Sequence, residues 1–458
     1  MSSKALPGFR EFYPDELARR AHIFGAWRAV ARRYAFLEYD GPPLEPLELY
    51  TKKSGDEIIG QLYNFVDKGG RDVALRPEMT PTFARMVGSK ANALRKPVRW
   101  FSIPQLFRYE RAQRGRLREH FQLNVDIVGE AGEVADAELL ALAIDIMREL
   151  GLTSADVRAR VSDRRLLSGV LATIGVAESA HATVHSVIDK VLRQPREVSA
   201  AKLSEAGLTA PLIDRVLALA GPTTYEALRS GFGAAPAARE HVDRFGRYLA
   251  HLDALGVGEW VQIDLSIVRG LAYYTGIVFE LFDAKGELRA ICGGGRYDTL
   301  LKALGGADLP ALGFGMGDVV LGELLEARAL FPTDVRNGAE LHLVAGNGAG
   351  QRPYADALAL VTALRRGGFS VDHTMSAERY LSQATRNQVD FARKAGAAAA
   401  VYFREDGATE CVSLLGKMTG APTHSMDTTR LLGGDAQVLL GLREWLARQP
   451  HTAPRDNG

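Results

Sequence analysis

The chain has 458 residues, of which 47% are hydrophobic and 24% are charged. This balance is typical of a globular protein of two or three domains, and it excludes a mainly disordered chain, a coiled coil and a collagen-like chain. The 56 Lys and Arg residues and the 55 Asp and Glu residues leave a formal charge of +1. That charge excludes a polycation, but a local basic patch remains compatible with nucleic-acid binding.

Cysteine usage and hydrophobic patterning indicate a cytoplasmic protein. The two cysteines, Cys292 and Cys411, are too few for a disulfide framework or a cysteine-rich zinc site. No run of about 18 uncharged apolar residues is present, so we expect no membrane-spanning helix. Residues 1–10 contain no apolar core of signal-peptide length, and we expect no targeting segment.

The first part of the chain predicts alternating helices and strands. A helix is expected to begin at Pro14, where a proline and two acidic residues form a typical first turn. The segments that follow are predicted strands where β-branched and aromatic residues gather, and a helix where apolar residues recur at helical spacing. The predicted strands are 73–75, 98–103, 121–128 and 157–161, and the predicted helix is 136–150.

The composition changes between residues 164 and 250, which are rich in Ala and Leu, helical in pattern and without a clear strand. We interpret this segment as a helical insertion. Strands are expected to resume at 260–267, 276–282 and 288–292. Two blocks of strands interrupted by helices predict an α+β fold with a largely antiparallel sheet.

A linker is predicted at 329–338, and strands and helices alternate after it. This alternation indicates βαβ units and a parallel-rich sheet in an α/β domain of about 110 residues. The predicted strands are 341–345, 369–373 and 398–403, and the predicted helices are 354–366 and 380–395. Residues 447–458 are polar and contain proline, so we expect a flexible tail.

The densest chemical signal is an arginine-rich hairpin at 95–120. Guanidinium groups pair bidentately with phosphate oxygens, so the pattern favours a phosphate ligand, although a solvated charged hairpin is the alternative. Its eight basic residues are Arg95, Lys96, Arg99, Arg108, Arg111, Arg114, Arg116 and Arg118.

Three other clusters are candidates for ligand contacts. In 75–82, two prolines stiffen a loop that could hold Glu78 and Thr80 towards an ammonium group, or form a rigid polar turn. In 269–276, two glycines bracket a pair of tyrosines that suit specificity contacts or an ordinary turn. In 293–298, three glycines at the end of a predicted strand permit close backbone approach or serve a flexible loop.

In order and spacing these clusters resemble the histidyl-tRNA synthetases, a family of class II aminoacyl-tRNA synthetases, and in detail a plant-type branch of it. The similarity covers nearly the whole chain. Its elements are the opening loop Pro7–Glu11, motif 1 at Pro42–Glu45, motif 2 at Phe107–Glu110, the two histidine-specific motifs at Arg269–Tyr274 and Gly293–Asp298, and motif 3 at Gly313–Asp318.

The resemblance implies a class II antiparallel-sheet catalytic core with a helical insertion, followed by a C-terminal α/β anticodon-binding domain. The implied boundaries are 1–165 and 251–328 for the core, 166–250 for the insertion, 339–446 for the anticodon-binding domain and 447–458 for the tail. The implied reaction is activation of L-histidine with ATP to histidyl-adenylate, then transfer to the 3′ end of tRNA(His). The family also implies a homodimer, and Mg²⁺ bound with ATP rather than at a site made by protein alone.

Residue by residue, the resemblance implies two adjoining sites. Gln122 and Asp126 lie at alternate positions of one predicted strand and so share a face. They would complete a histidine pocket made by Glu78, Met79, Thr80, Gln122, Asp126, Tyr273 and Tyr274. The resemblance implies ATP contacts from Arg108, Glu110, Arg116 and His120, phosphate or tRNA contacts from Arg111 and Arg118, and catalysis by Arg108 and Arg269.

Motif 3 departs from the family pattern, because Val319 and Val320 stand where a Glu-Arg pair is usual. That arginine normally stacks on adenine, so the contact that holds adenine here is left open. Two other functions also remain open. One is a non-catalytic, histidine-binding regulatory subunit of ATP phosphoribosyltransferase, and the other is an enzyme that passes histidyl-adenylate to a different acceptor.

Overall fold

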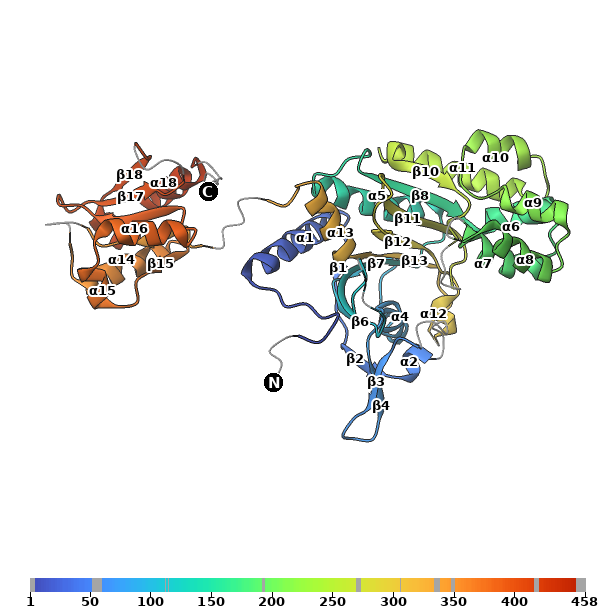
Figure 1. The fold of residues 1–458 in the computed structure, drawn as a ribbon, viewed down its shortest axis with the longest axis horizontal. Helices are drawn as coiled ribbons and strands as arrows, with labels where there is room; N and C mark the ends of the chain where they lie inside the picture. Colours follow the sequence, from blue (N-terminus) through green and yellow to red (C-terminus); the bar gives the residue numbers. More distant parts are fainter. Residues whose placement is uncertain are drawn as a thin grey trace. The chain divides into compact units, whose positions relative to one another are not determined.

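The computed structural model describes residues 5–51, 60–111, 113, 115–191, 194–268, 273–304, 306–332, 338–346, 351–415 and 420–449. The chain divides into two compact units (Figure 1). The larger comprises Met1–Glu11 and Arg19–Phe331, and the smaller comprises Phe12–Ala18 and Pro332–Gly458. Within the described residues, no helix combines the length and apolar character needed to cross a bilayer.

A ten-stranded sheet forms the centre of the large unit, in the order β1-β5-β7-β13-β12-β11-β8-β10-β9, with β6 also paired to β7. Every neighbouring pair from β5 to β8 in this order is antiparallel. The α+β fold class is therefore confirmed. The strands are β1 (Leu37–Glu38), β5 (Val98–Ser102), β6 (Gln105–Phe107), β7 (Glu119–Val128), β8 (Val157–Asp163), β9 (Pro222–Thr223), β10 (Val261–Asp264), β11 (Ile277–Asp283), β12 (Cys292–Arg296) and β13 (Ala311–Gly317).

Helices pack against this sheet. Helix α5 (Glu133–Glu149) contacts β7, β12 and β13, and α13 (Asp318–Ala327) contacts β7 and β13. Leu142 of α5, Val125 of β7 and Trp27 of α1 (Pro14–Arg33) are fully buried members of one core. Burying a side chain of this size stabilises the fold by about 1.5–3 kcal/mol. This packing fixes β7, which carries His120, Gln122 and Asp126 of the candidate site, and its neighbour β13.

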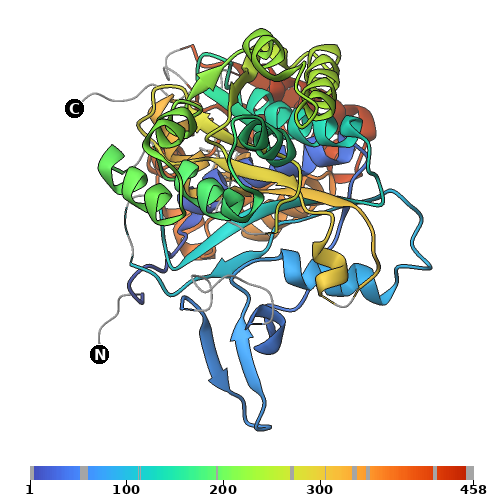
Figure 2. The same cartoon turned by 90° about the vertical axis from the view of Figure 1, so that its right-hand side faces the viewer.

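A small sheet in the order β2-β4-β3 joins the large unit beside the hairpin of motif 2. Its strands are β2 (Leu44–Pro46), β3 (Tyr63–Val66) and β4 (Asp72–Leu75). The β3–β4 hairpin projects as a two-stranded arm (Figure 2). Short helices α2 (Glu48–Thr51) and α12 (Leu300–Ala303) and the longer α4 (Thr80–Ser89) complete this region.

The segment that the sequence predicts as helical is mostly helix and clusters at one end of the large unit (Figure 1). It contains α6 (Arg164–Thr173), η1 (Glu178–Ala180), α7 (His181–Ile188), α8 (Arg196–Glu205), α9 (Ala210–Leu217) and α10 (Tyr225–Phe232), and it ends within α11 (Arg239–Ala254), which η3 (Gly258–Trp260) follows. The sequence shows no clear strand in this segment, and the structure has one short strand there. The two-residue β9 pairs with β10, a tertiary contact that local composition does not encode.

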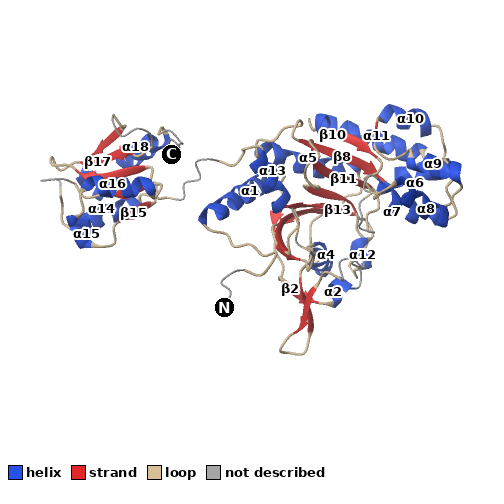
Figure 3. Ribbon diagram, viewed as in Figure 1, coloured by secondary structure: helices blue, strands red, loops and turns tan. Residues whose placement is uncertain are grey.

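The smaller unit is a five-stranded sheet in the order β15-β14-β16-β17-β18 (Figure 3). Strands β14 (Leu341–Leu343), β15 (Val371–His373) and β16 (Ala399–Phe403) are parallel, as predicted, and β17 (Thr409–Ser413) and β18 (Thr423–Met426) extend the sheet in antiparallel fashion. Its helices are α14 (Tyr354–Arg366), α15 (Ala377–Ser382), α16 (Thr385–Lys394), α17 (Thr428–Leu432) and α18 (Ala436–Ala447).

Two predicted elements were wrong. The single helix at 380–395 is split at Gln383, and the Gln388 side chain donates to the carbonyls of Tyr380 and Gln383 that the break frees. The strand at 288–292 instead runs from Cys292 to Arg296, so its glycines lie within a strand. A Cβ on Gly294 would approach the carbonyl oxygen of Gly313 to 2.5 Å, so the close backbone approach that these glycines permit is to a neighbouring strand.

Candidate active site

The loop of 76–80 and the motif 2 hairpin, about 30 residues apart in sequence, are hydrogen-bonded to each other. The Phe107 amide donates to the Arg76 carbonyl at 3.0 Å, and Arg108 Nε donates to the Pro77 carbonyl at 2.9 Å. Glu78 and Met79 are buried within this loop, and Thr80 begins α4. The structure therefore brings Arg108 against the loop that the sequence predicts for histidine binding.

Arg76 anchors that loop, although sequence reasoning gave it no role. It is buried, its Nε donates to the Gln105 carbonyl at 3.0 Å, and its Nη1 donates to the Gly41 carbonyl at 2.7 Å and to Asp40 Oδ1 at 2.8 Å. A buried guanidinium that satisfies several carbonyls is costly to remove, because its partners lose their donors. The one sequence signal was an arginine at the end of an apolar strand.

Gln122 and Asp126 lie on one face of β7, as their alternation predicts, and the glycines of β13 make room for them. Gly313 pairs with Asp126, and a Cβ on Gly313 would overlap the Asp126 carboxylate. A Cβ on Gly315 would lie 2.8 Å from Gln122 Cδ. The missing Cβ at both motif 3 positions therefore leaves room for two polar side chains that cross the strand there.

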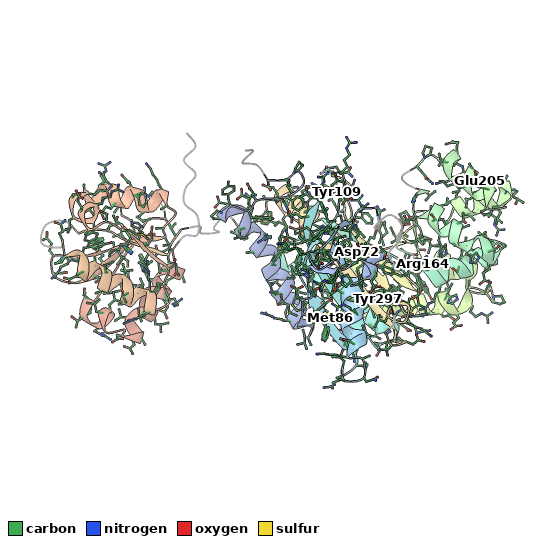
Figure 4. The ribbon with its side chains drawn as sticks, turned by 90° about the horizontal axis from the view of Figure 1, so that it is seen from below. Asp72, Met86, Tyr109, Arg164, Glu205 and Tyr297 are labelled. Carbon is green, nitrogen blue, oxygen red and sulfur yellow. The ribbon has the colours of Figure 1, made fainter. Side chains whose placement is uncertain are left out.

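Asp126 is the most perturbed carboxyl group of this face. It is buried, and burial raises its pKa to about 7, although a hydrogen bond donated by the Tyr297 hydroxyl to Oδ1 opposes the rise. The Tyr297 ring lies 5.8 Å from that of Tyr273 in an edge-to-face arrangement, and Tyr273 lies 4.9 Å from Tyr274. The three tyrosines thus form one aromatic wall beside Asp126. Figure 4 labels Tyr297 among the side chains of the large unit.

Tyr297 was missed as an individual residue, since sequence reasoning named only the string 293–298 around it. Its position after three glycines was the available signal. A buried tyrosine next to a buried carboxyl group is a polar pair in an apolar wall, the arrangement that fixes the orientation of a small ligand.

The remaining arginines of the hairpin have different environments. Arg116 Nε lies 2.5 Å from Glu110 Oε2. Arg118 lies 4.5 Å from the Tyr109 ring centroid and donates through Nε to the Glu110 carbonyl at 3.2 Å. Arg111 is exposed. The hairpin therefore carries both exposed and partly buried cations, and among its described arginines Arg108 donates a hydrogen bond to the buried loop.

His120 lies among these cations and is held neutral. Burial, followed by the charges of Arg108, Arg10 and Arg116, lowers its pKa to about 3. A neutral imidazole with a flat apolar face suits contact with a heteroaromatic base, whereas an imidazolium would add a further positive charge.

Arg10 connects the opening loop to the start of β7 and to the start of α13, a role that the sequence did not reveal. Its Nε lies 2.7 Å from Glu119 Oε1 and its Nη1 lies 2.8 Å from Asp318 Oδ2. Asp318 also accepts the Phe121 amide at 2.9 Å. The first residue after the motif 3 glycines is thus an acid that binds Arg10.

Motif 3 continues into α13 with an apolar side chain where the family has arginine. Val320 is buried, and it lies against the turn at Gly115, where a Cβ would meet Val320 Cγ2 at 3.3 Å. The position therefore faces the turn of the motif 2 hairpin. Arg269 lies outside the described residues, so the structure leaves its distance from Arg108 open.

The antiparallel sheet with its arginine-rich hairpin, its neutral histidine and its buried carboxyl–tyrosine pair is the arrangement expected of a class II aminoacyl-tRNA synthetase catalytic domain. The family model described as histidyl-tRNA synthetase matches residues 8–317. The chain belongs to the histidyl-tRNA synthetase family, which confirms the resemblance seen in the sequence.

Curated relatives agree with this assignment, and a solved structure shares the fold. The chain is 49% identical over 377 residues to the histidine–tRNA ligase of Opitutus terrae, an alignment that covers 81% of this chain and 85% of that protein. It is 43% identical over 325 residues to the chloroplastic/mitochondrial histidine–tRNA ligase of Arabidopsis thaliana, covering 71% and 66% respectively. The histidyl-tRNA synthetase structure from Nostoc sp. shares the fold with a TM-score of 0.76 at 21% identity, covering 94% of this chain and 98% of that one.

Proposed function

We propose that this chain activates L-histidine with ATP to form histidyl-adenylate and transfers the histidyl group to the 3′ end of tRNA(His). The observation that carries the proposal is the contact of Arg108 with the loop 76–80. This contact puts the guanidinium of Arg108, a motif 2 residue, beside the segment before α4. That segment forms part of the proposed amino-acid pocket. Family membership and the high identity to histidine–tRNA ligases support the reaction.

The proposed histidine pocket consists of Glu78, Met79, Thr80, Gln122, Asp126, Tyr273 and Tyr274. Glu78 and Thr80 bind the α-ammonium group, and Gln122 and Asp126 supply the polar face of β7. A pocket that pairs both polar ends of histidine rejects analogues that leave its own buried groups unpaired.

The proposed nucleotide site consists of Arg108, Glu110, Arg116 and His120. Arg108 binds the α-phosphate and the histidine carboxylate, and neutral His120 lies against adenine. Arg269, from the other histidine-specific motif, stabilises the charge that develops on the α-phosphate as the carboxylate attacks. The reaction needs no covalent enzyme intermediate, only positioning and electrostatic stabilisation of an in-line displacement.

We assign Mg²⁺ to the ATP phosphates. No group of three or more His, Cys, Asp or Glu side chains placed to hold a metal ion occurs in the part of the chain that the structure describes. Magnesium commonly binds through one or two carboxylates together with substrate phosphates and water. Glu110 is the carboxylate of the proposed nucleotide site and fits that pattern.

Transfer to tRNA involves further regions in this proposal. Residues 1–165 and 251–328 form the catalytic core, 166–250 form an insertion, and 339–446 form the anticodon-binding domain. Arg111 and Arg118 contact phosphates of ATP or the tRNA acceptor end. We place the enzyme in the cytoplasm.

We also propose that the enzyme is a homodimer. Apolar side chains are exposed on three strands outside the middle of the large sheet: Leu37 of β1 is 67% exposed, Phe65 and Val66 of β3 are 51% and 63% exposed, and Leu44 of β2 is 38% exposed. Large apolar side chains left exposed on strands are candidates for burial at a protein interface. Light scattering on the purified protein measures the mass directly.

The regulatory-subunit alternative is not favoured. The relatives at 40–49% identity are histidine–tRNA ligases, whereas the similarity to the structure from Bacillus halodurans described as an ATP phosphoribosyltransferase regulatory subunit/histidyl-tRNA synthetase rests on 22% identity. Use of another acceptor would appear as histidine activation without tRNA charging.

The test is ATP–pyrophosphate exchange with Arg108→Ala and a matched control from the same hairpin. Arg108→Ala should lose about 3 kcal/mol of transition-state stabilisation, a rate loss of more than 100-fold. Arg99→Gln should retain exchange, because Arg99 pairs with Glu138 of α5 at 2.6 Å. Unchanged exchange in Arg108→Ala would contradict the assignment of Arg108.

A further inference from the structure

The segment that leads from the paired tyrosines into β11 is held by side chains from two other parts of the chain. The Thr275 amide donates to the Arg296 carbonyl at 2.7 Å, and the Thr275 carbonyl accepts a bond from Arg165 Nε at 2.8 Å. The Thr275 hydroxyl lies 3.1 Å from the Asp298 amide, which donates to it. Thr275 is thus fixed through its amide, its carbonyl and its hydroxyl.

Arg165 reaches this point from the first turn of α6, which opens the helical segment. Asp163, at the N-cap of α6, accepts the Arg165 amide at 2.7 Å, which fixes the backbone from which the side chain extends. The Arg165 Nη2 atom donates to Asp298 Oδ2 at 2.8 Å, and the Arg165 Nε atom donates to the Thr275 carbonyl. The preceding residue, Arg164, donates its amide to the Gly276 carbonyl at 3.1 Å, and Figure 4 labels it where the helical segment joins the large unit.

Asp298 forms ion pairs with two guanidinium groups, one buried and one partly exposed. Arg296 is fully buried, lies 2.6 Å from Asp136 and 3.2 Å from Asp298, and is therefore a fixed anchor. The Arg165 side chain is 31% exposed and is the partner that comes from the helical segment. Between the two residues Arg296 and Asp298, Tyr297 projects to Asp126.

We propose that Arg165 is a positioning residue for histidine recognition. Arg165 hydrogen-bonds Thr275 and Asp298 at the same time. It thereby fixes the positions of the two tyrosines before Thr275 and of Tyr297, which precedes Asp298, beside Asp126. The inference rests on the proposed function, and it adds a physical link between the helical segment and the amino-acid pocket. A guanidinium suits the task because its planar fork binds two acceptors at once, which an ammonium group cannot do in the same geometry.

The test is a kinetic comparison in the ATP–pyrophosphate exchange assay using the full-length protein. Arg165→Gln should raise the KM for histidine roughly tenfold or more, because both hydrogen bonds that the guanidinium donates to Thr275 and Asp298 are lost, and it should leave the KM for ATP within about twofold. Arg165→Lys should restore part of the loss. Asp298→Asn should raise the KM for histidine in the same way, and the double variant should be little worse than either single one.

The matched control is Arg158→Gln, an arginine of β8, the strand that leads into α6, whose side chain binds elsewhere. Arg158 is an exposed residue of β8 whose Nη1 donates to the Glu259 carbonyl, so its loss should leave both KM values unchanged. A purely structural role for Arg165 predicts instead a lower melting temperature and parallel changes in both KM values.

The outcomes separate this inference from the proposed function. Absence of histidine-dependent exchange in the unmodified protein would refute the proposed function itself. Active unmodified protein, together with an unchanged histidine KM or equal changes in both KM values in the Arg165 variants, would overturn the inference alone. If Arg165→Gln fails to fold, Arg165→Lys and Asp298→Asn decide by the same criterion.

Discussion

The replacement of Gly315 by alanine tests whether the glycines of β13 exist to make room for the side chains of the site. The new Cβ would lie 2.8–2.9 Å from the Gln122 Cδ, Nε2 and Oε1 atoms. Ordinary contacts between such atoms begin at about 3.5 Å, so the amide group must move by about 0.6 Å or more. The obstructed group is the far end of a flexible side chain, and the strand itself can stay in place.

The expected effect is therefore on function more than on stability. A displacement approaching 1 Å at a substrate-binding group lowers the rate up to about 100-fold. We expect Gly315→Ala to reduce kcat/KM for histidine by roughly 10- to 100-fold, which is about 1.4–2.7 kcal/mol. The melting temperature should change little, because Gln122 is only half-buried and can rotate away.

Two glycines serve as controls in the same exchange assay and thermal melt. Gly317 ends the same strand, and a Cβ there would meet nothing within 4 Å, so Gly317→Ala should match the unmodified protein. Gly294→Ala should destabilise the fold by about 3 kcal/mol or more, since its Cβ would meet backbone that cannot move aside. Normal histidine kinetics in Gly315→Ala would refute the reasoning about Gln122.

Two further predictions concern stability. The pKa of His120 is lowered from an ordinary 6.5 to about 3, so below pH 6.5 the unfolded chain takes up a proton that the folded protein refuses. The free energy of unfolding should fall as pH drops from about 6.5 towards 3, and His120→Gln should flatten that slope in urea titrations at pH 7 and pH 4.5; an identical slope would contradict it. Arg76→Met should lower the free energy of unfolding by about 2–5 kcal/mol, because the carbonyls of Gly41 and Gln105 lose their donor. A urea midpoint equal to that of the unmodified protein would show that these bonds contribute nothing.

Local patterns predicted those parts of the fold that local physics determines. Helix α14 begins and ends at the predicted residues because apolar spacing and the flanking proline and glycine all agree. The shared face of Gln122 and Asp126 follows from the two-residue period of a strand. Glycine has low strand propensity, and this is why β12 was displaced by several residues: its place in the sheet depends on close approach to β13.

The rest of the candidate site depends on contacts between distant parts of the chain. Arg10 binds Asp318 across 308 positions, and the Tyr297 hydroxyl reaches Asp126 across 171. No periodicity in the sequence signals such pairs. The break between α15 and α16 is similar, because it is stabilised by the Gln388 side chain rather than by a proline or glycine at the break.

The most direct test of the account is a crystal structure of the protein with a non-hydrolysable histidyl-adenylate analogue. The account predicts that the imidazole and ammonium groups lie between the loop 76–80 and the face of β7 that carries Gln122 and Asp126. It also predicts that Arg108 lies within hydrogen-bond distance of the group that replaces the α-phosphate. An analogue bound away from β7, or an Arg108 side chain that faces away from it, would contradict the account.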